Sequence, residues 1–287
     1  MAIMTFDQFQ GIFNGIIFEK SKSDLLEKIS SSPSRYIGLF RPTKPRGKIL
    51  QNLLQSHEIR FGDAFETLIE EYFKLKGSRM LPKRLTNTDG DALSVDQLFE
   101  MNGKVYFIEQ KVRDDHDSTK KRGQIQNFEK KLSVLLNHFS EKSLEGIIYF
   151  IDPELTKNKN YYLDELKKIG SDYNVKLYLY YGKELYVALG LQDIWEEIIL
   201  YLEEWKKEIP DLPEINFDLN AENTFEEIKD LSPQVYRKLL SDDNIFNEIL
   251  TTIFPSRTTL GLLLSYFKTK QSTIYRTLAY RLSERLK

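Results

Sequence analysis

Three residues, Asp96, Glu109 and Lys111, are spaced so that they are expected to share one face of a two-stranded sheet. Two carboxylates about 5 Å apart repel each other unless a proton or a cation lies between them. A hard divalent cation with oxygen ligands suits such a pair, and the neighbouring ammonium group would orient or polarise an attacking water. The alternative is an exposed cross-strand charge cluster, but Leu98 and Phe107 on the same face indicate partial burial, which makes unpaired acids costly.

A predicted β-hairpin places these side chains. Residues 92–101 and 104–112 are two apolar-rich runs joined by Asn102-Gly103. Asn-Gly favours a two-residue type I′ turn, since both residues tolerate positive φ, and such a turn fixes the strand register. In that register the two acids face each other, and the alternation of side chains along a strand brings the lysine to their face.

At these residues the chain resembles the PD-(D/E)xK nucleases, and among them the type II restriction endonucleases. The motif of that family is an acidic residue on one strand and (D/E)-x-K on the next. Asp96 corresponds to the first part and Glu109-Gln110-Lys111 to the second, whereas Val95 stands where the family often has proline. The resemblance covers about residues 46 to 190 and implies a restriction-endonuclease-like core, a mixed β-sheet flanked by helices.

The resemblance also implies a magnesium site. Mg²⁺ retains several waters and needs only one or two carboxylates, so Asp96, Glu109 and the Gln110 carbonyl would suffice to hold it. Lys111 is expected to orient the attacking water. In this family a helix before the hairpin often lends a further glutamate. Glu58 is the first candidate here and Glu66 the second, although the helix dipole alone also favours an acid at a helix start.

The order of the expected elements fits such a core. Apolar periodicity predicts one or two helices within residues 5–31 and a helix at 57–76. Strands separated by helices indicate a mixed sheet with helical cover, so the fold class is α/β. After the hairpin, the pattern predicts helices at 124–140, 160–172 and 191–207 and strands at 145–151 and 175–181. The predicted organisation is a helical N-terminal segment with a basic loop at 1–45, a nuclease core at 46–207, a linker at 208–221 and an all-helical C-terminal region at 222–287.

The composition argues against several other chemistries. Of the 287 residues, 41% are hydrophobic and 29% are charged, as in an ordinary soluble protein. The chain contains no cysteine and three histidines, so thiol catalysis, zinc-thiolate sites and histidine-rich metal sites are not expected. No apolar run reaches the length of a membrane span, and residues 1–8 lack the features of a signal peptide, so the expected location is the cytoplasm and no membrane partner is expected.

A first basic cluster follows directly after the hairpin and is a candidate DNA contact. The segment that carries this cluster would begin where the second strand ends, close to the phosphate that is cleaved. The alternative is that this segment is a simple solvated loop. Lys120, Lys121 and Arg122 suit contacts to the DNA backbone, whereas Arg113, Gln124 and Asn127 suit base edges. The interspersed acids, Asp114, Asp115 and Asp117, are expected to accept hydrogen bonds from bases or to restrain the arginines.

A second basic cluster lies at the C-terminal end. The net charge of the chain is −2, yet residues 257–287 carry seven basic side chains and one acid. The pattern predicts a helix, a short turn at 268–271 and a last helix with Ser272 as N-cap, which is the layout of a helix-turn-helix with Lys268, Lys270 and Arg276 as DNA contacts. The turn lacks the usual glycine, so a basic helical hairpin that packs on the core or dimerises is the alternative.

Together these features predict a Mg²⁺-dependent type II restriction endonuclease that hydrolyses phosphodiester bonds in double-stranded DNA at a specific short sequence. Cutting both strands of a palindrome would need a homodimer, because two-fold protein symmetry mirrors the symmetry of the site. A cognate methyltransferase is expected in the same system, without a stable complex. A repair or junction-resolving nuclease is a variant within the class. The alternative from another class is a non-catalytic DNA-binding regulator with a degenerate core, against which the intact Asp, Glu and Lys set argues.

Overall fold

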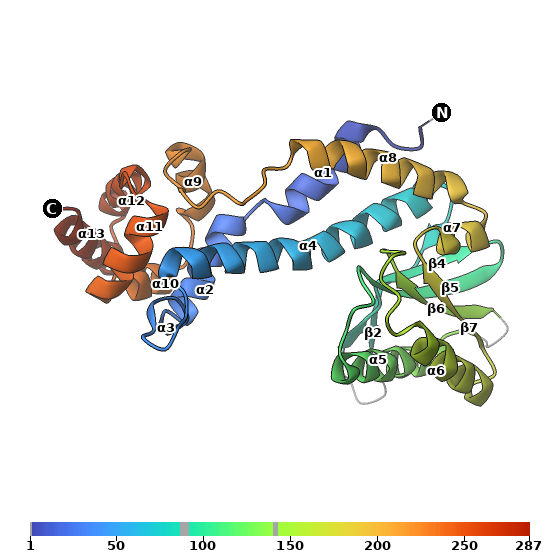
Figure 1. Ribbon diagram of the computed structural model, residues 1–287. Helices are drawn as coiled ribbons and strands as arrows, with labels where there is room; N and C mark the ends of the chain where they lie inside the picture. Colours follow the sequence, from blue (N-terminus) through green and yellow to red (C-terminus); the bar gives the residue numbers. More distant parts are fainter. Residues whose placement is uncertain (1, 87–91, 140–142) are drawn as a thin grey trace. The chain divides into compact units, whose positions relative to one another are not determined.

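The computed structural model describes residues 2–86, 92–139 and 143–287, and it divides into two compact units (Figure 1). Each unit combines two segments of the chain. Unit 1 consists of Met1–Phe13 and Gly62–Glu208, and unit 2 of Asn14–Phe61 and Ile209–Lys287. The segments predicted from the sequence are contiguous, whereas both compact units are assembled from residues far apart in the chain.

Unit 1 contains a five-stranded mixed sheet with the order β1-β4-β5-β6-β7 (Figure 1). The first three strands pair antiparallel, and β5, β6 and β7 run parallel. Parallel neighbours need a crossover, which α5 (Ser118–Leu136) and α6 (Lys159–Asp172) supply. The predicted fold class, a restriction-endonuclease-like α/β core with helical ends, is confirmed. The strands are β1 (Arg79–Met80), β4 (Gln97–Met101), β5 (Lys104–Lys111), β6 (Leu144–Phe150) and β7 (Lys176–Tyr181).

The predicted hairpin is present in β4 and β5. Asn102 and Gly103 adopt φ values of 52° and 75°, as a type I′ turn requires, and Gln97 pairs with Ile108. The prediction of one continuous strand over 92–101 is wrong, however. Its first part forms β3 (Ala92–Ser94), which pairs with β2 (Arg84–Thr86) in a separate two-stranded sheet. The chain bends at Val95-Asp96, so Asp96 precedes β4 instead of lying within it.

Helices cover both faces of the sheet of unit 1. On one face, Phe128 of α5 and Tyr162 of α6 pack with Phe107 and Phe150 in a single core. On the other face, Phe73 of α4 (Pro45–Leu75) lies against Phe99 with ring centroids 4.5 Å apart. The central strands are therefore buried on both sides, and every residue of β6 is buried. This second face is completed by α1 (Phe6–Ile17), α7 (Lys183–Leu189) and α8 (Gln192–Glu208).

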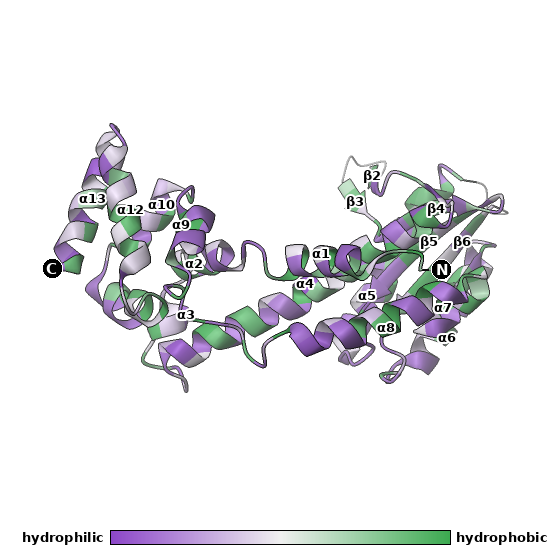
Figure 2. Cartoon of the chain, turned by 90° about the horizontal axis from the view of Figure 1, so that it is seen from above, coloured by the Kyte–Doolittle hydropathy of each residue, from purple (hydrophilic) through white to green (hydrophobic). Residues whose placement is uncertain are grey.

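Several helices differ from the prediction in their bounds. The predicted helix at 57–76 begins at Pro45, so the last part of the expected basic loop is helical. The predicted helix at 124–140 begins at Ser118, and α7 was not predicted. In Figure 2 purple and green alternate along the helices, which is the amphipathic pattern on which the predictions rested.

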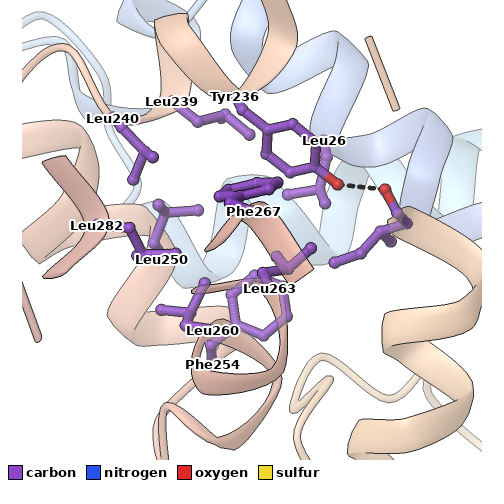
Figure 3. Close-up of a pocket in the computed structure, with 11 residues that line it drawn as sticks. Leu26, Tyr236, Leu239, Leu240, Leu250, Phe254, Leu260, Leu263, Phe267 and Leu282 are labelled. Atoms are coloured by element: carbon purple, nitrogen blue, oxygen red, sulfur yellow. Dashed lines mark hydrogen bonds between the residues drawn. The ribbon is translucent and has the colours of Figure 1, made fainter. Parts of the chain in front are cut away.

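Unit 2 is all-helical and has its own apolar core. Leu25 and Ile29 of α2 (Ser21–Ser31) pack with side chains from the C-terminal helices. Figure 3 shows the centre of this core, where Tyr236 donates a hydrogen bond to the Ile228 carbonyl among leucine and phenylalanine side chains. The remaining helices are α3 (Ser34–Ile37), α9 (Ala221–Ile228), α10 (Pro233–Leu239), the π-helical η1 (Ile245–Leu250), α11 (Thr251–Ile253), α12 (Thr258–Thr269) and α13 (Thr273–Leu286).

The segment predicted as a linker contributes to the core of unit 2. Ile215 and Phe217 are buried in it, and the Asp218 carboxylate accepts hydrogen bonds from the backbone N–H groups of Ser256 and Thr259.

None of the helices within the described residues is both long and apolar enough to cross a membrane.

Candidate functional site

Asp96, Gln110 and Lys111 meet at the carboxyl end of β5. One Asp96 carboxylate oxygen, Oδ2, accepts a hydrogen bond from the Gln110 backbone N–H at 2.8 Å and lies 3.1 Å from the Lys111 ammonium. The Lys111 ammonium also donates to the Gln110 carbonyl at 2.6 Å. The bend before β4 thus brings Asp96 onto β5, and the ammonium lies between two oxygens predicted to hold a cation.

Glu109 lies next to this group and is almost fully buried. Both of its carboxylate oxygens accept hydrogen bonds from Lys131 Nζ, at 2.6 and 2.7 Å. Burial and, to a smaller extent, the negative charge of Asp96 raise the pKa of Glu109 to about 7, and the positive charge of Lys131 opposes both. The structure therefore places the two acids near each other and gives each a lysine partner, Lys111 for Asp96 and Lys131 for Glu109.

Lys131 is a site residue that the sequence reasoning missed. It lies on α5, three residues after Phe128 and four before Leu135, both of which are buried. An ionisable residue in phase with an apolar stripe is an anomaly, because charged side chains normally occupy the other face of a helix. The sequence shows this signal at Lys131, as it does at Glu58, which precedes Phe61 by three residues and Phe65 by seven on the apolar stripe of its helix.

Of the two candidates for a further acid, Glu66 is the one that the structure relates to Asp96. The charge of Asp96 contributes to a raised pKa of Glu66, whose main cause is burial. Lys83 forms ion pairs with Glu66 and Glu70, and the Gln97 side chain donates to the Glu66 backbone carbonyl at 2.6 Å. Glu58 belongs to unit 2, whereas Asp96 and Glu109 belong to unit 1.

The donor set suits a hard divalent cation. Asp96, Glu109 and the Gln110 carbonyl offer only oxygen, and a cationic ammonium already bonds to two of these groups. Across residues 2–86, 92–139 and 143–287 no cluster of three or more His, Asp or Glu side chains is arranged to hold a metal. Mg²⁺ needs one or two carboxylates and completes its shell with water, so this lean set of donors fits it.

The first basic cluster lies on the N-terminal turns of α5, not in a loop. Lys121 Nζ lies 4.5 Å from the centroid of the Tyr161 ring, and Arg122 Nε donates to the Ser118 carbonyl at 3.1 Å. Gln124 accepts a hydrogen bond from the Tyr162 hydroxyl. Lys120 and Asn127 are exposed. Arg113 lies two residues after the end of β5, at the start of the connection to α5, and is exposed.

The expected DNA role of the interspersed acids is corrected at Asp114, and Asp117 has a structural role as well. Asp114 is fully buried and accepts hydrogen bonds from Asn158 N at 2.8 Å, Asn158 Nδ2 at 2.8 Å and the Tyr181 hydroxyl at 2.9 Å. Asp117 is the N-cap of α5 and accepts from the backbone N–H groups of Thr119 and Lys120. Both acids hold the chain that leads from β5 to the basic helix, and the buried Asp114 is not available to a base.

The C-terminal basic cluster lies on two helices joined by a three-residue turn. Ser272 caps α13 by accepting from the Ile274 backbone N–H, as predicted. Lys270 Nζ lies 4.3 Å from the Tyr266 ring centroid. Lys268 and Arg276 form no ion pair within the described part of the chain, and Arg276 is exposed on α13. The layout of a helix-turn-helix is present, although its turn has no glycine.

A mixed sheet with an acid before one strand and a Glu-x-Lys sequence on the next, flanked by helices on both faces, defines a PD-(D/E)xK restriction-endonuclease-like protein. Residues 75–206 match the model of the family described as type II restriction endonuclease, HinfI. The match covers this segment of the chain and indicates a restriction-endonuclease-like domain there.

One solved structure has a low similarity to the chain. It is Can2 from Sulfobacillus thermosulfidooxidans, in complex with cyclic tetra-adenylate, which is 14% identical to the chain at a TM-score of 0.31. The alignment covers 70% of this chain and 54% of Can2, so the chain spans about half the length of that protein. No curated protein matched the sequence.

Proposed function

We propose that the chain is a Mg²⁺-dependent type II restriction endonuclease that hydrolyses phosphodiester bonds of double-stranded DNA at a specific short sequence. The observation that carries the proposal is the convergence of Asp96, Glu109 and Lys111 at the end of β5, in a segment that matches the restriction-endonuclease family. The partial burial of these groups favours a functional site over a solvated charge cluster, because charges removed from water are costly unless they have partners.

Asp96, Glu109 and the Gln110 carbonyl are proposed to hold the metal ion. Glu66 is the candidate for a further ligand, reached directly or through water, and Glu58 is the other acid predicted for this role. When bound, Mg²⁺ would neutralise charge on the phosphoryl oxygens and lower the pKa of a bound water.

Lys111 is proposed to orient the attacking water. Its ammonium bonds both to Asp96 and to the Gln110 carbonyl, so its position is fixed by the same two groups that are proposed to hold the metal. Lys131 neutralises one carboxylate in a buried environment, where repulsion between Asp96 and Glu109 would otherwise favour protonation of one of them. Asp96, Glu109, Lys111 and Lys131 together form a group in which two acids lie close to each other and the net charge is small.

DNA contacts are proposed for the basic face of α5 and for the C-terminal helices. Lys120, Lys121 and Arg122 would contact phosphates, and Arg113, Gln124 and Asn127 would contact base edges. Lys268, Lys270 and Arg276 would add contacts from unit 2. A homodimer would cut both strands of a palindrome, and the expected partner in the cell is a methyltransferase of the same specificity.

Plasmid digestion tests the proposal directly. The protein is incubated with supercoiled and linear plasmid in buffer with Mg²⁺ and, in parallel, with EDTA. We expect discrete fragments with Mg²⁺ and intact DNA with EDTA. Sequencing of the fragment ends then gives the recognition sequence and the stagger of the two cuts.

Two outcomes would contradict the proposal. DNA binding without cleavage in any divalent metal would favour the non-catalytic regulator. A smear without discrete fragments, or cutting only at branched junctions, would favour a repair or junction-resolving nuclease.

A further inference from the structure

Two adjacent apolar side chains of unit 2 project into solvent. Leu39 is 90% exposed and Phe40 97% exposed, more than any other large hydrophobic side chain within the described residues. Single exposed apolar residues are common on protein surfaces, but an adjacent pair that is almost completely exposed marks an interaction site. Leu39 and Phe40 are therefore candidates for contact with a partner.

The backbone holds this pair at the tip of a tight turn. The Arg41 backbone N–H donates to the Gly38 carbonyl at 3.2 Å, so Leu39 and Phe40 occupy the two corner positions of a β-turn. The Gly38 N–H donates to the Ser34 carbonyl, and a Cβ at Gly38 would lie 2.6 Å from that oxygen. Tyr36, which is buried in the core of unit 2, anchors the preceding helix. Corner positions normally carry small or polar residues, so local turn chemistry does not explain the apolar pair.

The surroundings of the turn are strongly basic. From Lys28 to His57 the sequence contains six lysines and arginines and no aspartate or glutamate. Arg41, Lys44 and Arg46 are exposed and form no ion pair within the described part of the chain. Arg46 also lies in the first turn of α4, which has no acid and where the helix dipole adds positive potential. A nearby acid, Glu248, lines a hollow beside Tyr36 and Gly38, and Leu39 and Phe40 are not part of that lining.

We propose that the Gly38–Arg41 turn is a DNA wedge, in which Leu39 and Phe40 contact unstacked bases while Arg41, Lys44 and Arg46 bind the flanking phosphates. Proteins that bend DNA insert Phe or Leu side chains between base steps and hold the deformed duplex with basic residues. The Gly38–Arg41 turn carries two apolar side chains at its tip, and basic residues without any acid flank it in the sequence. These are the two features that such proteins use. This role rests on the proposed function, because it assigns these residues to the DNA that the endonuclease would cut.

Two other partners would bind an apolar tip. A membrane with anionic lipids would attract the same charges, and a second copy of the chain would cover the same side chains. The charge of the segment opposes pairing of two such turns, since equal positive clusters repel each other. The match to an endonuclease family favours DNA over a lipid surface.

The test uses the full chain and a matched pair of variants. The first replaces the apolar tip, Leu39→Ser with Phe40→Ser. The control replaces two other exposed leucines of unit 2, Leu212→Ser with Leu219→Ser, which are 57% and 69% exposed. Both changes remove exposed side chains, so both variants should fold as the wild type does. Binding to a mixed-sequence DNA duplex and to a duplex that spans a mapped cleavage position is measured by anisotropy with Ca²⁺ in place of Mg²⁺.

We expect the tip variant to bind the cleavage-site duplex about tenfold more weakly or worse, in line with the value of base–aromatic stacking. The control variant should bind as the wild type does. A 2-aminopurine placed near the cleavage position should brighten with wild-type protein and stay quenched with the tip variant. Equal binding and equal 2-aminopurine signals for the tip variant and the wild type would overturn the proposal.

A tryptophan reporter separates the possible partners. In Phe40→Trp the new indole should be quenched and become shielded from iodide when duplex DNA is added. Shielding by phosphatidylglycerol vesicles but not by DNA would overturn the proposal in favour of a membrane. Conversion of a dimer to a monomer by the tip variant, with DNA affinity unchanged, would overturn it in favour of a second copy.

Failure of the wedge and failure of the proposed function give different results. If wild-type protein cuts plasmid with Mg²⁺ and the tip variant binds normally, only the wedge is wrong. If the Phe40→Trp protein binds DNA with its indole quenched but neither it nor the wild type ever cuts, the wedge stands and the proposed catalysis is wrong.

Discussion

The pairing of Glu109 with Lys131 determines the environment of one of the two acids proposed to be catalytic. Each side chain is 8% exposed, so neither charge is solvated and each depends on the other. Burial raises the pKa of Glu109 to about 7 even with the ammonium present. Glu109 therefore exchanges its proton near neutral pH, whereas an ordinary glutamate releases it below pH 5.

The first prediction at this scale concerns the catalytic set. Asp96→Ala, Glu109→Ala and Lys111→Ala should each reduce plasmid cleavage by at least about 100-fold, because each removes a group that holds the metal or orients water. DNA affinity in Ca²⁺ should stay close to that of the wild type. The control is Glu100→Ala on β4, an acid paired with Arg79 at the edge of the sheet. Wild-type cleavage rates in either acid variant would refute the site.

The second prediction concerns Lys131. Lys131→Met should weaken divalent-cation binding by about 10- to 100-fold at pH 7, the usual effect of removing a group that orients a metal ligand. Isothermal titration with Ca²⁺ or Mn²⁺ measures it. Lys130→Met is the control, since Lys130 is adjacent and exposed. Equal affinity in Lys131→Met and wild type would show that this ion pair is independent of the metal site.

The third prediction is a pH dependence of the same binding. A proton and a metal ion compete for the Glu109 carboxylate, so a pKa of about 7 predicts weak cation binding at pH 6 and strong binding at pH 8. Without the Lys131 ammonium the carboxylate loses a favourable charge, and its pKa should rise. The binding curve of Lys131→Met should therefore move to higher pH. A pH-independent affinity between about 6 and 8 would contradict the prediction.

Among the connections between elements, the loop from β5 to α5 is held by one buried acid. Asp114→Ala would remove three hydrogen bonds and leave the Asn158 backbone N–H and the Tyr181 hydroxyl without their acceptor. We expect a loss of about 3 kcal/mol in the free energy of unfolding, measured by urea titration. Asp115→Ala, at a half-exposed neighbour, should cost far less. Equal losses in both variants would mean that the buried network does not stabilise the fold.

The elements of the core were predictable where local chemistry decides them. The Asn102-Gly103 turn fixed the register of β4 and β5, and the period of the apolar residues located α5, β6, α6 and β7. The break at Val95-Asp96 was not predictable in this way. Residues 92–94 pair with β2, and such a long-range pairing leaves no periodic signal in the sequence.

The candidate site was also predictable only where its residues are placed by local structure. Glu109 and Lys111 follow from the alternation along β5, which is local, whereas Asp96 reaches β5 through the bend at Val95-Asp96, outside the paired register. The Glu109–Lys131 contact joins a strand to a helix 22 residues later, and only tertiary packing creates it. Asp114 resembled a loop acid in the sequence because its partners, Asn158 and Tyr181, lie far along the chain.

For the whole molecule, the C-terminal helices are best tested by point substitutions. Truncation near residue 220 would remove side chains that pack on Leu25 and Ile29, so a failure to bind DNA would not separate a direct DNA contact from misfolding. Lys268→Gln, Lys270→Gln and Arg276→Gln combined should weaken DNA binding and reduce the log–log salt slope by up to about 0.9 for each phosphate that is no longer neutralised. The control is Arg237→Gln with Lys238→Gln on α10, which are exposed. An unchanged slope in the triple variant would exclude α12 and α13 from the DNA interface.

The division of both units between distant segments has a consequence for synthesis on the ribosome. When Glu208 has emerged, every segment of unit 1 is available, whereas α2 and α3 still lack Ile209–Lys287, with which they share a core. At roughly 5–20 residues per second this interval lasts several seconds, during which Leu25, Leu26 and Ile29 lack the part of their native core that Ile209–Lys287 supplies. The nuclease core of a growing chain would then mature first, and the unit with the basic turn and the C-terminal helices would follow only as translation proceeds.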